Sequence, residues 1–518
     1  MAPNDAQKIN ASAYYLDRHI GNGEAERTAL RTDSMSWSYR ELLVQVKVAA
    51  RTLGSVGVKP GDRIVLIHPD GPQAVAFLFA AMRIGAAPAP IPTQLTDEEF
   101  SFICRDCEPA AVIVDSARAE RVARLTTRLS APPRIIVSDD DQRNPPADSA
   151  LSEGDDPPPV LVDPDHIALL QYTSGSTGTP KGVVHLHRGL LALPAAFGNR
   201  LALTHSDTCY STAKLSFGYG LGNSVFFPMA AGASTYLRAA PSDPLGVLQA
   251  IHSAQPTVVF AGPTLYAAIA AIPDAAGTFA LSSVRLYVSA GDMLSAVLFD
   301  RWEKKFGHRI LDGLGSTECL HIFISAEPSK QIAGQLGTVI APYQARLVDD
   351  AGEVLERGST GLLEVKGPAT FARYWNLPVQ TEATLKHGWV RTGDVLYHSH
   401  EGNFSYVGRD DDMFKVNEMK VSPVEIEHVL NSHPAVAECA VVGRPDRRGL
   451  PSVCAFVRLT EGCQRSTELE RDLRATVRHT LSPHKVPKAF EFVTELPRTS
   501  TGKLTRHMLR AEPLTTST

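Results

Sequence analysis

Short apolar runs alternate with longer amphipathic stretches along most of the 518-residue chain. Runs of four to six mainly β-branched or aliphatic residues are typical of buried strands. They predict strands at 63–67, 111–115, 134–137, 167–172, 257–260 and 284–288, and a helix over 72–84. Strands separated by helices are typical of βαβ units, so the sequence predicts an α/β fold with largely parallel sheets.

The pattern changes at two places. Residues 132–164 hold eight prolines and many aspartates, which predicts a surface excursion within a large domain. From residue 415 the chain predicts a compact α+β unit with helices at 423–430 and 467–480 and strands at 436–442 and 452–459. We therefore expect a large N-terminal domain of packed βαβ sheet subdomains, 1–409, and a small C-terminal domain, 410–518.

Composition narrows the class of protein. Hydrophobic residues make up 43% and charged residues 21%, as in ordinary globular proteins. The 51 Lys and Arg against 56 Asp and Glu give a net charge of −5, which provides no electrostatic basis for binding nucleic acid or an anionic membrane. Residues 1–20 contain no apolar signal-peptide core, and the longest apolar run, 74–82, is far shorter than the roughly 20 residues of a membrane span.

The seven cysteines predict thiols in a reducing cytoplasm, because the chain is long and the number is odd. Cys104 and Cys107 form a CxxC pair, but no second pair follows at zinc-site spacing, so we expect no metal there. The sequence makes no prediction of an oligomeric state.

The strongest chemical signal lies at 172–183, which reads YTSGSTGTPKGV. A predicted strand runs into a loop of glycines and hydroxyl residues that ends in Lys181. Backbone N–H groups and hydroxyls of such a loop can surround a polyphosphate, and the lysine supplies positive charge. It is not a Walker A loop, because Pro180 precedes the lysine and the glycine spacing differs. The alternative, a flexible Gly/Ser linker, is disfavoured by the preceding strand.

This segment resembles the phosphate loop of the adenylate-forming superfamily, which comprises acyl- and aryl-CoA synthetases, peptide-synthetase adenylation domains and luciferase. Four further segments resemble family motifs in the family's order: GSTE at 315–318, RTGD at 391–394, GRDDD at 408–412 and PRTSTGK at 497–503. Residues 37–95 also resemble the family's N-terminal region. The resemblance therefore covers most of the chain.

The resemblance implies a role for each matched residue. ATP would contact Thr173, Ser174, Gly175, Ser176, Thr177, Gly178, Lys181, Asp292, Asp312, Gly313, Asp394 and Arg409. Thr317 would contact phosphate, Glu318 would hold Mg²⁺, Asp394 would bind the ribose, Asp411 would be the hinge and Lys503 the catalytic lysine. The C-terminal domain would rotate between two half-reactions.

These roles make chemical sense, since a carboxylate becomes reactive once it has attacked the α-phosphate of ATP. Such a site must align the attack and neutralise phosphoryl charge, which a mobile lysine and Mg²⁺ can do. Taken alone, Glu318 could be a helix-cap carboxylate, Asp394 an Asx-turn residue and Lys503 a solvated lysine. Their motif context disfavours all three alternatives.

A narrower resemblance, to the benzoate-CoA ligase branch, appears at 213–223, 312–325 and 415–427. It places the aryl acid among Phe217, Gly218, Tyr219, Ala290, Gly315, His321 and Ile322. Glycines and alanine would leave a flat slot for an aromatic ring. Tyr219 and His321 could hydrogen-bond the carboxylate or a ring substituent, although core packing is an alternative for both.

The chain departs from the branch at three places. Gly218 stands where benzoate-using relatives carry Ala, so we expect room for a ring substituent and favour anthranilate (2-aminobenzoate). Asp292 stands where Glu is usual. On the CoA side, which comprises Lys415, Asn417, Glu418 and Lys420, Asn417 and Glu418 replace a common Ser-Gly, which leaves the acceptor open.

The sequence thus predicts a cytoplasmic AMP-forming aryl-CoA ligase that uses ATP, Mg²⁺ and CoA. Three alternatives remain. A free-standing enzyme could load the aryl group onto a carrier-protein phosphopantetheine, a luciferase-like oxygenase could share the motifs, and a non-catalytic nucleotide-binding module could have kept them. The presence of every charged motif residue disfavours the last.

Overall fold

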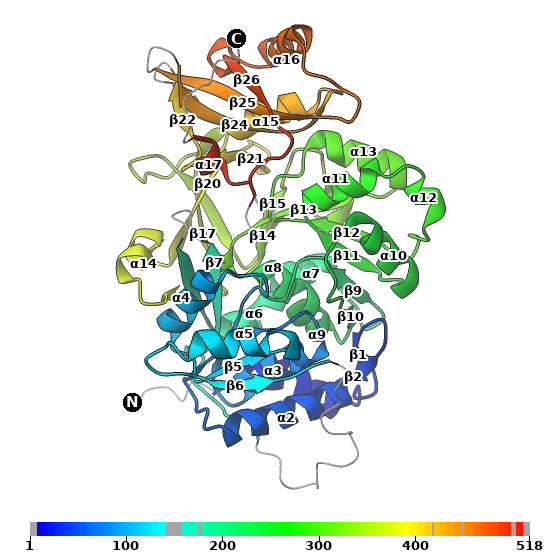
Figure 1. Ribbon diagram of the computed structural model, residues 1–518, viewed down its shortest axis with the longest axis vertical. Helices are drawn as coiled ribbons and strands as arrows, with labels where there is room; N and C mark the ends of the chain where they lie inside the picture. The colour runs from blue at the N-terminus through cyan, green and yellow to red at the C-terminus, as the bar shows by residue number, and fades with distance from the viewer. Residues whose placement is uncertain are drawn as a thin grey trace.

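The structure is a computed structural model that describes residues 8–140, 158–174, 179–416, 419–446, 450–498 and 504–510, with only the backbone of Ser174. The N-terminal elements gather at one end of the long axis, and the C-terminal elements, orange and red in Figure 1, lie at the other. The green sheet between them carries four of the residues predicted to line the site, Asp312, Gly313, Gly315 and Ile322.

One four-stranded sheet is parallel throughout and has the strand order β4-β3-β5-β6. It comprises β3 (Arg63–Ile67), β4 (Ala87–Pro90), β5 (Ala111–Val114) and β6 (Arg134–Val137). Helices α2 (Tyr39–Ser55) and α3 (Pro72–Arg83) pack on one face, and α4 (Asp97–Cys107) and α5 (Ser116–Thr126) pack on the other. Because α3 lies between α2 and the sheet, every residue of α3 is buried, which explains its long apolar run.

The larger sheet has nine strands among the described residues, in the order β15-β14-β13-β12-β11-β9-β10-β1-β2. Its central strands are parallel, and the pairs β13/β14, β14/β15 and β1/β2 are antiparallel. Their bounds are β1 (Thr28–Arg31), β2 (Ser36–Ser38), β9 (Thr208–Ser211), β10 (Ser234–Tyr236), β11 (Val258–Ala261), β12 (Leu286–Ser289), β13 (Ile310–Gly315), β14 (Ile322–Ser325) and β15 (Thr338–Val339).

Helices cover both faces of the nine-stranded sheet. On one face lie α10 (Pro244–Ala254), α11 (Pro263–Ala271), α12 (Ala275–Thr278) and α13 (Ala296–Phe306), packed around Tyr266, Tyr287 and Trp302. The other face meets the main core with α1 (Arg18–Gly21), α6 (His187–Ala192), α7 (Phe197–Leu201), α8 (Gly218–Leu221) and α9 (Phe227–Ala231).

Two antiparallel sheets complete the large body. One contains β7 (Ile167–Ser174), β8 (Pro180–Leu186) and β18 (Arg373–Tyr374). The other contains β16 (Gln344–Val348), β17 (Ser359–Lys366), β19 (Leu385–Lys386), β20 (Trp389–His398) and β21 (Phe404–Arg409), with α14 (Pro378–Thr384) beside it. The parallel arrangement predicted for 167–172 is therefore wrong, because β7 pairs with the strand that follows it through a hairpin.

The C-terminal elements form their own sheets and core. The hairpin β22 (Phe414–Val416) and β23 (Met419–Val421) precedes a three-stranded sheet of β24 (Val436–Pro445), β25 (Pro451–Leu459) and β26 (Ala489–Phe492). Helices α15 (Pro423–Asn431) and α16 (Thr467–Thr480) pack on it, and α17 (Arg506–Arg510) closes the described chain. The α+β character predicted here is confirmed, while a division at residue 409 into separate domains stays a prediction.

Two further predictions concern the cysteines and the proline-rich stretch. All seven cysteines are free thiols, as predicted, and burial raises the pKa of both Cys104 and Cys107 to about 12. The strand predicted at 134–137, at the start of the proline-rich stretch 132–164, is confirmed as β6, and 141–157 lies outside the described residues.

Within the part of the chain that the structure describes, no helix is both long and apolar enough to cross a membrane.

Candidate active site

The predicted phosphate loop joins the antiparallel strands β7 and β8, where Thr173 pairs with Lys181. Strand β7 is held to helix α4, because the Tyr172 hydroxyl donates to Asp106 Oδ2 at 2.6 Å. Gly182 permits close packing, since a side chain there would meet Tyr172 and Trp375 at 3.1 Å. The predicted residues Gly175, Ser176, Thr177 and Gly178 lie outside the described residues.

Lys181 and Glu318 meet at the aromatic ring of Tyr374. Strand β18 adds Tyr374 to the edge of β8, opposite Val183. The Lys181 ammonium lies 5.7 Å from the centre of the Tyr374 ring, and the Tyr374 hydroxyl donates to Glu318 Oε1 at 2.7 Å. Burial and the Glu318 charge raise the pKa of Tyr374 well above its usual value, so the hydroxyl stays a donor.

A short turn fixes Glu318 in position. The 3₁₀ segment Thr317–Cys319 follows β13 and is capped by the Ser316 hydroxyl, which accepts from the Cys319 N–H at 3.3 Å. The Phe371 N–H donates to the Glu318 carbonyl at 2.6 Å. Thr317 and Glu318 thus offer oxygen ligands on a backbone held at both ends.

The oxygen atoms of Thr317 and Glu318 suit an Mg²⁺ ion that is also bound to a nucleotide, because they are too few to hold a metal by protein ligands alone. Mg²⁺ takes oxygen ligands and keeps several waters, so one carboxylate together with phosphates suffices. No group of three or more His, Cys, Asp or Glu that could hold a metal ion occurs among the described residues. Glu318 is therefore a fitting single ligand for a nucleotide-bound Mg²⁺.

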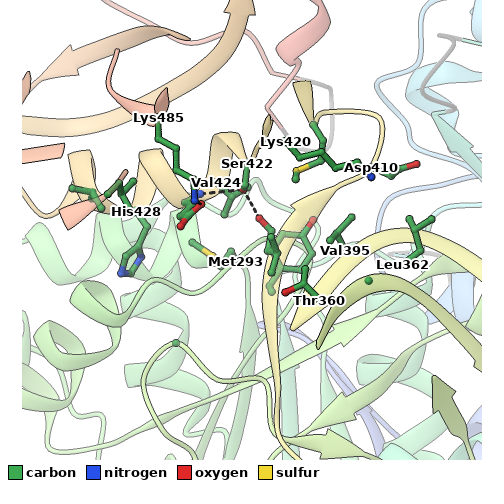
Figure 2. Close-up of a pocket in the computed structure, with 18 of the residues that line it drawn as sticks. Met293, Thr360, Leu362, Val395, Asp410, Lys420, Ser422, Val424, His428 and Lys485 are labelled. Atoms are coloured by element: carbon green, nitrogen blue, oxygen red, sulfur yellow. Dashed lines mark hydrogen bonds and ion pairs between the residues drawn. The ribbon is translucent and has the colours of Figure 1, made fainter. Parts of the chain in front are cut away.

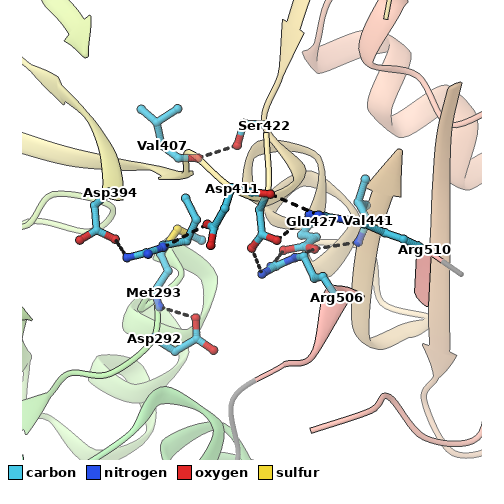
Figure 3. Close-up of polar contacts among 12 residues, drawn as sticks. Asp292, Met293, Asp394, Val407, Asp411, Ser422, Glu427, Val441, Arg506 and Arg510 are labelled. Atoms are coloured by element: carbon cyan, nitrogen blue, oxygen red, sulfur yellow. Dashed lines mark hydrogen bonds and ion pairs between the residues drawn. The ribbon is translucent and has the colours of Figure 1, made fainter. Parts of the chain in front are cut away.

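Asp394 and Arg409 face each other on the adjacent strands β20 and β21. Asp394 is 5% exposed, and Arg409 Nη1 donates to its Oδ1 at 3.2 Å (Figure 3). The same nitrogen donates to the Thr392 carbonyl at 2.9 Å. Burial alone would lower the pKa of Arg409, but Asp394 and Asp411 raise it above its usual value. A buried carboxylate held this way can accept hydrogen bonds from ribose hydroxyls.

The predicted hinge continues from this pair into the C-terminal elements. Arg409 Nε donates to Asp411 Oδ1 at 3.4 Å, and the Arg510 guanidinium donates to the Asp411 carbonyl at 3.2 Å. Beside them, Arg506 pairs with Asp412 at 3.1 Å and with buried Glu427 at 2.7 Å (Figure 3). The segment around Asp411 therefore lies between two sets of ion pairs.

The other predicted nucleotide residues lie on the nine-stranded sheet or just after it. Asp312, on β13, is 5% exposed, and burial raises its pKa to about 8. Gly313 lies against Ile322, whose side chain would be 2.8 Å from an added Cβ. Asp292 is exposed and accepts from the Met293 N–H at 2.8 Å (Figure 3).

The predicted acid pocket gathers aromatic rings around His321. Phe197 stacks on this imidazole with a centroid distance of 5.4 Å, Phe227 meets it edge-on at 4.6 Å, and Tyr219 lies at 5.4 Å. Burial lowers the pKa of His321 to about 3, so the ring is neutral. Gly315 and Ile322 adjoin it, and Ala290 and Phe217 are placed just after β12 and just before α8.

The polar atoms of this pocket are partly engaged. The Tyr219 hydroxyl donates to the Val288 carbonyl at 3.2 Å, and His321 Nε2 lies 3.0 Å from Asn223 Oδ1. Because both side chains already make a hydrogen bond, each has only part of its hydrogen-bonding capacity left for the acid. On His321, Nδ1 is the ring nitrogen that makes no hydrogen bond among the described residues.

Gly218 does not open space for a substituent in the way the sequence suggests. A Cβ at this position would lie 2.5 Å from the Leu320 carbonyl oxygen and 2.8 Å from Gln171 Oε1. The volume freed by the missing methyl is therefore filled by two polar groups. This corrects the expectation of an enlarged pocket at Gly218.

The predicted CoA side lies across a cleft between the two parts of the chain. Lys415 pairs in register with Lys420 in the β22/β23 hairpin, and Lys420 Nζ lies 3.1 Å from Asp350 Oδ1. A cavity of about 810 Å³ opens beside this hairpin, with Met293 on one side and Ser422, His428 and Lys485 on the other (Figure 2). Asn417, Glu418 and Lys503 lie outside the described residues, so their roles stay predictions.

Comparisons with known proteins match this organisation. The family of AMP-binding enzymes matches residues 16–375, and the C-terminal domain of AMP-binding enzymes matches residues 425–503. A benzoate–CoA ligase of Thauera aromatica is 34% identical over 98% of this chain and 96% of its own length.

Two anthranilate-using proteins are also similar. The anthranilate–CoA ligase of Pseudomonas aeruginosa is 36% identical over 90% of this chain and 89% of its own. A crystal structure of the anthranilate CoA ligase AuaEII with anthranoyl-AMP superposes with a TM-score of 0.90 at 33% identity, covering 97% and 96% of the two chains.

Proposed function

This chain belongs to the AMP-binding enzyme family, and we propose on that basis that it joins an aromatic carboxylic acid to CoA. It is an AMP-forming acid–thiol ligase that uses ATP, Mg²⁺ and CoA. The carboxylate attacks the α-phosphate of ATP, giving acyl-AMP and pyrophosphate. The CoA thiol then attacks the acyl carbon, loses its proton and displaces AMP.

The observation that carries this proposal is the contact of Lys181, Tyr374 and Glu318. The Lys181 ammonium and the Glu318 carboxylate are brought to one side chain from β8 and from the turn after β13. A triphosphate on the β7/β8 loop would meet the lysine, and Mg²⁺ bound at Glu318 would neutralise phosphate charge. Asp394 would hold the ribose, with Arg409 beside it.

The C-terminal domain supplies the remaining parts of the proposed mechanism. Lys503 would serve adenylate formation as a point charge near the α-phosphate. The domain would then turn about Asp411 and bring Lys415, Asn417, Glu418 and Lys420 to the thiol acceptor. Using one cleft for both half-reactions excludes water from the reactive adenylate.

We propose a benzoate with a polar ring substituent as the acid, with anthranilate as the first candidate. Support comes from the aromatic walls around neutral His321, where a flat ring can stack, and from the similarity to anthranilate and benzoate ligases across nearly the whole chain. Free CoA is the proposed acceptor, with a carrier protein as the alternative. A cytoplasmic location stays a prediction.

An acid panel tests this proposal. AMP release would be measured with benzoate, the aminobenzoates, the hydroxybenzoates, acetate and a long-chain fatty acid, each with free CoA or with a holo-carrier protein. We expect the aromatic acids with free CoA to give the highest kcat/KM. A clear preference for acetate or the fatty acid would refute the aryl assignment, and activity with the carrier alone would refute the CoA assignment.

A further inference from the structure

Gln171 is a buried side chain with no role in the mechanism above. It lies on β7 two residues before Thr173, and strand alternation directs it to the same face as Leu169. Leu169 belongs to the main core, whereas Leu170 and Tyr172 pack in the cluster on the other side. Gln171 therefore points from the phosphate-loop strand toward the interior that contains the acid pocket.

The amide of Gln171 has no hydrogen-bond partner within the part of the chain that the structure describes. The residue is 1% exposed, and neither Oε1 nor Nε2 makes a hydrogen bond among the described residues. Leaving such an amide buried without a partner costs free energy, because the amide loses its hydrogen bonds to water. A group that enters from outside and hydrogen-bonds the amide would remove this cost.

Two oxygen atoms approach one point beside Gly218. A Cβ there would lie 2.8 Å from Gln171 Oε1 and 2.5 Å from the Leu320 carbonyl oxygen. Leu320 has a φ of +65°, a strained backbone conformation for a leucine. Because this residue directly precedes His321, the strained turn directs a backbone acceptor to the same wall of the pocket as Gln171.

A wall with these acceptors favours a ligand with hydrogen-bond donors. A carbonyl oxygen can only accept, while the Gln171 amide can accept through Oε1 and donate through Nε2. An amino or hydroxyl substituent on the ring satisfies both groups, and an unsubstituted ring satisfies neither.

We propose that Gln171, together with the Leu320 carbonyl, binds an amino or hydroxyl substituent of the aromatic acid and so selects for it. This inference rests on the proposed function, because it requires the aryl ring to lie beside Gly218 and Tyr219. The pocket wall at Gly218 is therefore polar, and it is not enlarged as the sequence suggests. Gly218 is needed since any side chain would displace one of the two acceptors.

The test compares the wild type with Gln171→Leu, which keeps the approximate volume and removes the amide. Pyrophosphate release without CoA would be measured for benzoate and each amino- and hydroxybenzoate, so that the acceptor plays no part. We expect the wild type to prefer one substituted acid, and Gln171→Leu to lower the ratio of its kcat/KM to that of benzoate by about 10- to 100-fold. Gln45→Leu, at a buried glutamine of α2, is the matched control and should keep the wild-type ratio.

Thermal unfolding separates this role from a structural one. Since none of the described residues hydrogen-bonds the Gln171 amide, Gln171→Leu should unfold at the same or a higher temperature than the wild type. An unchanged ratio, an equal loss for all acids, or a fall of several degrees in Tm would overturn the inference while leaving the aryl ligase proposal intact. Absence of pyrophosphate release from every aromatic acid in the wild type would instead refute the proposed function itself.

Discussion

The Tyr374 hydroxyl donates a 2.7 Å hydrogen bond to Glu318 Oε1, although the two residues are 56 positions apart. The same ring lies 5.7 Å from the Lys181 ammonium. Tyr374 therefore positions the proposed metal ligand and stands beside the lysine of the phosphate loop. No motif in the sequence indicates this tyrosine, because its strand has only two residues and its partners come from distant segments.

Tyr374→Phe should weaken the response to Mg²⁺ while leaving acid binding intact. Without the hydroxyl, Glu318 loses a charge-assisted hydrogen bond that orients it, and such outer partners typically contribute 10- to 100-fold to metal affinity or activity. Titration of pyrophosphate release with Mg²⁺ should show a midpoint raised by about 10-fold. Tyr236→Phe, whose hydroxyl donates to Asp33, is the control. Equal Mg²⁺ midpoints in all three proteins would contradict the role of Tyr374.

Asp312 should make the protein less stable as the pH rises. Burial raises its pKa to about 8, whereas an unfolded aspartate has a pKa of about 3.9. Between these values the folded state keeps a proton that the unfolded state loses, so the free energy of unfolding falls with rising pH. Asp312→Asn mimics the protonated form, and its advantage in Tm should grow from pH 5 to pH 9.

Asp300→Asn, at an exposed position in α13, serves as the control for this series. The Tm advantage of Asp312→Asn should grow more steeply with pH than any change seen for Asp300→Asn. A Tm difference for Asp312→Asn that stays constant would show that the carboxyl at 312 does not titrate in this window.

The pair of Arg506 and Glu427 should be the main polar support of the hinge side of the C-terminal domain. Glu427 is 7% exposed and accepts both from Arg506 at 2.7 Å and from the Val441 N–H at 2.7 Å. Arg506→Met should lower stability by about 3–5 kcal/mol, because it leaves a buried charge unpaired. Adding Glu427→Gln should recover part of the loss in a urea unfolding experiment.

Arg458→Met provides the comparison for the hinge pair, since Arg458 pairs with Glu438 but is 41% exposed. An exposed pair typically contributes about 0–1 kcal/mol. If Arg506→Met and Arg458→Met lower stability equally, or if the double variant is no better than the single one, the pair at 506 and 427 has no special role.

Lys503→Ala should separate the two half-reactions. The variant should lose pyrophosphate release from acid and ATP, but it should still form thioester from supplied acyl-AMP and CoA. Lys415→Ala, on the predicted CoA side, should keep pyrophosphate release from acid and ATP but lose thioester formation from supplied acyl-AMP and CoA. Equal loss of both half-reactions in Lys503→Ala would contradict separate duties for the C-terminal domain.

Much of the fold follows from the sequence because its strands and helices have strong local signals. The run RIVLI forms β3 at Arg63–Ile67, and the amphipathic stretch at Thr467–Thr480 forms α16 with the predicted bounds. Strand partners are harder to predict, since an apolar run does not show which strand lies beside it. For this reason β7 appears in a parallel unit in the prediction and in an antiparallel hairpin in the structure.

Some features of the candidate site can also be predicted from the sequence, and others cannot. Motifs indicate Glu318, in the turn after β13, and Asp394, on β20, and the structure places both beside basic or hydroxyl groups. The sequence does not reveal contacts made across the fold. Gly218 illustrates this limit, because only the folded chain brings Leu320 and Gln171 into the space that the missing methyl leaves.

The most direct measurement is the stoichiometry of products from one aromatic acid, followed by mass spectrometry and nucleotide chromatography. With 2-aminobenzoate, ATP, Mg²⁺ and CoA, the account predicts one aryl-CoA thioester, one AMP and one pyrophosphate for each acid consumed. Formation of ADP and phosphate, or consumption of O₂ with the adenylate, or no thioester from any aromatic acid, would contradict it.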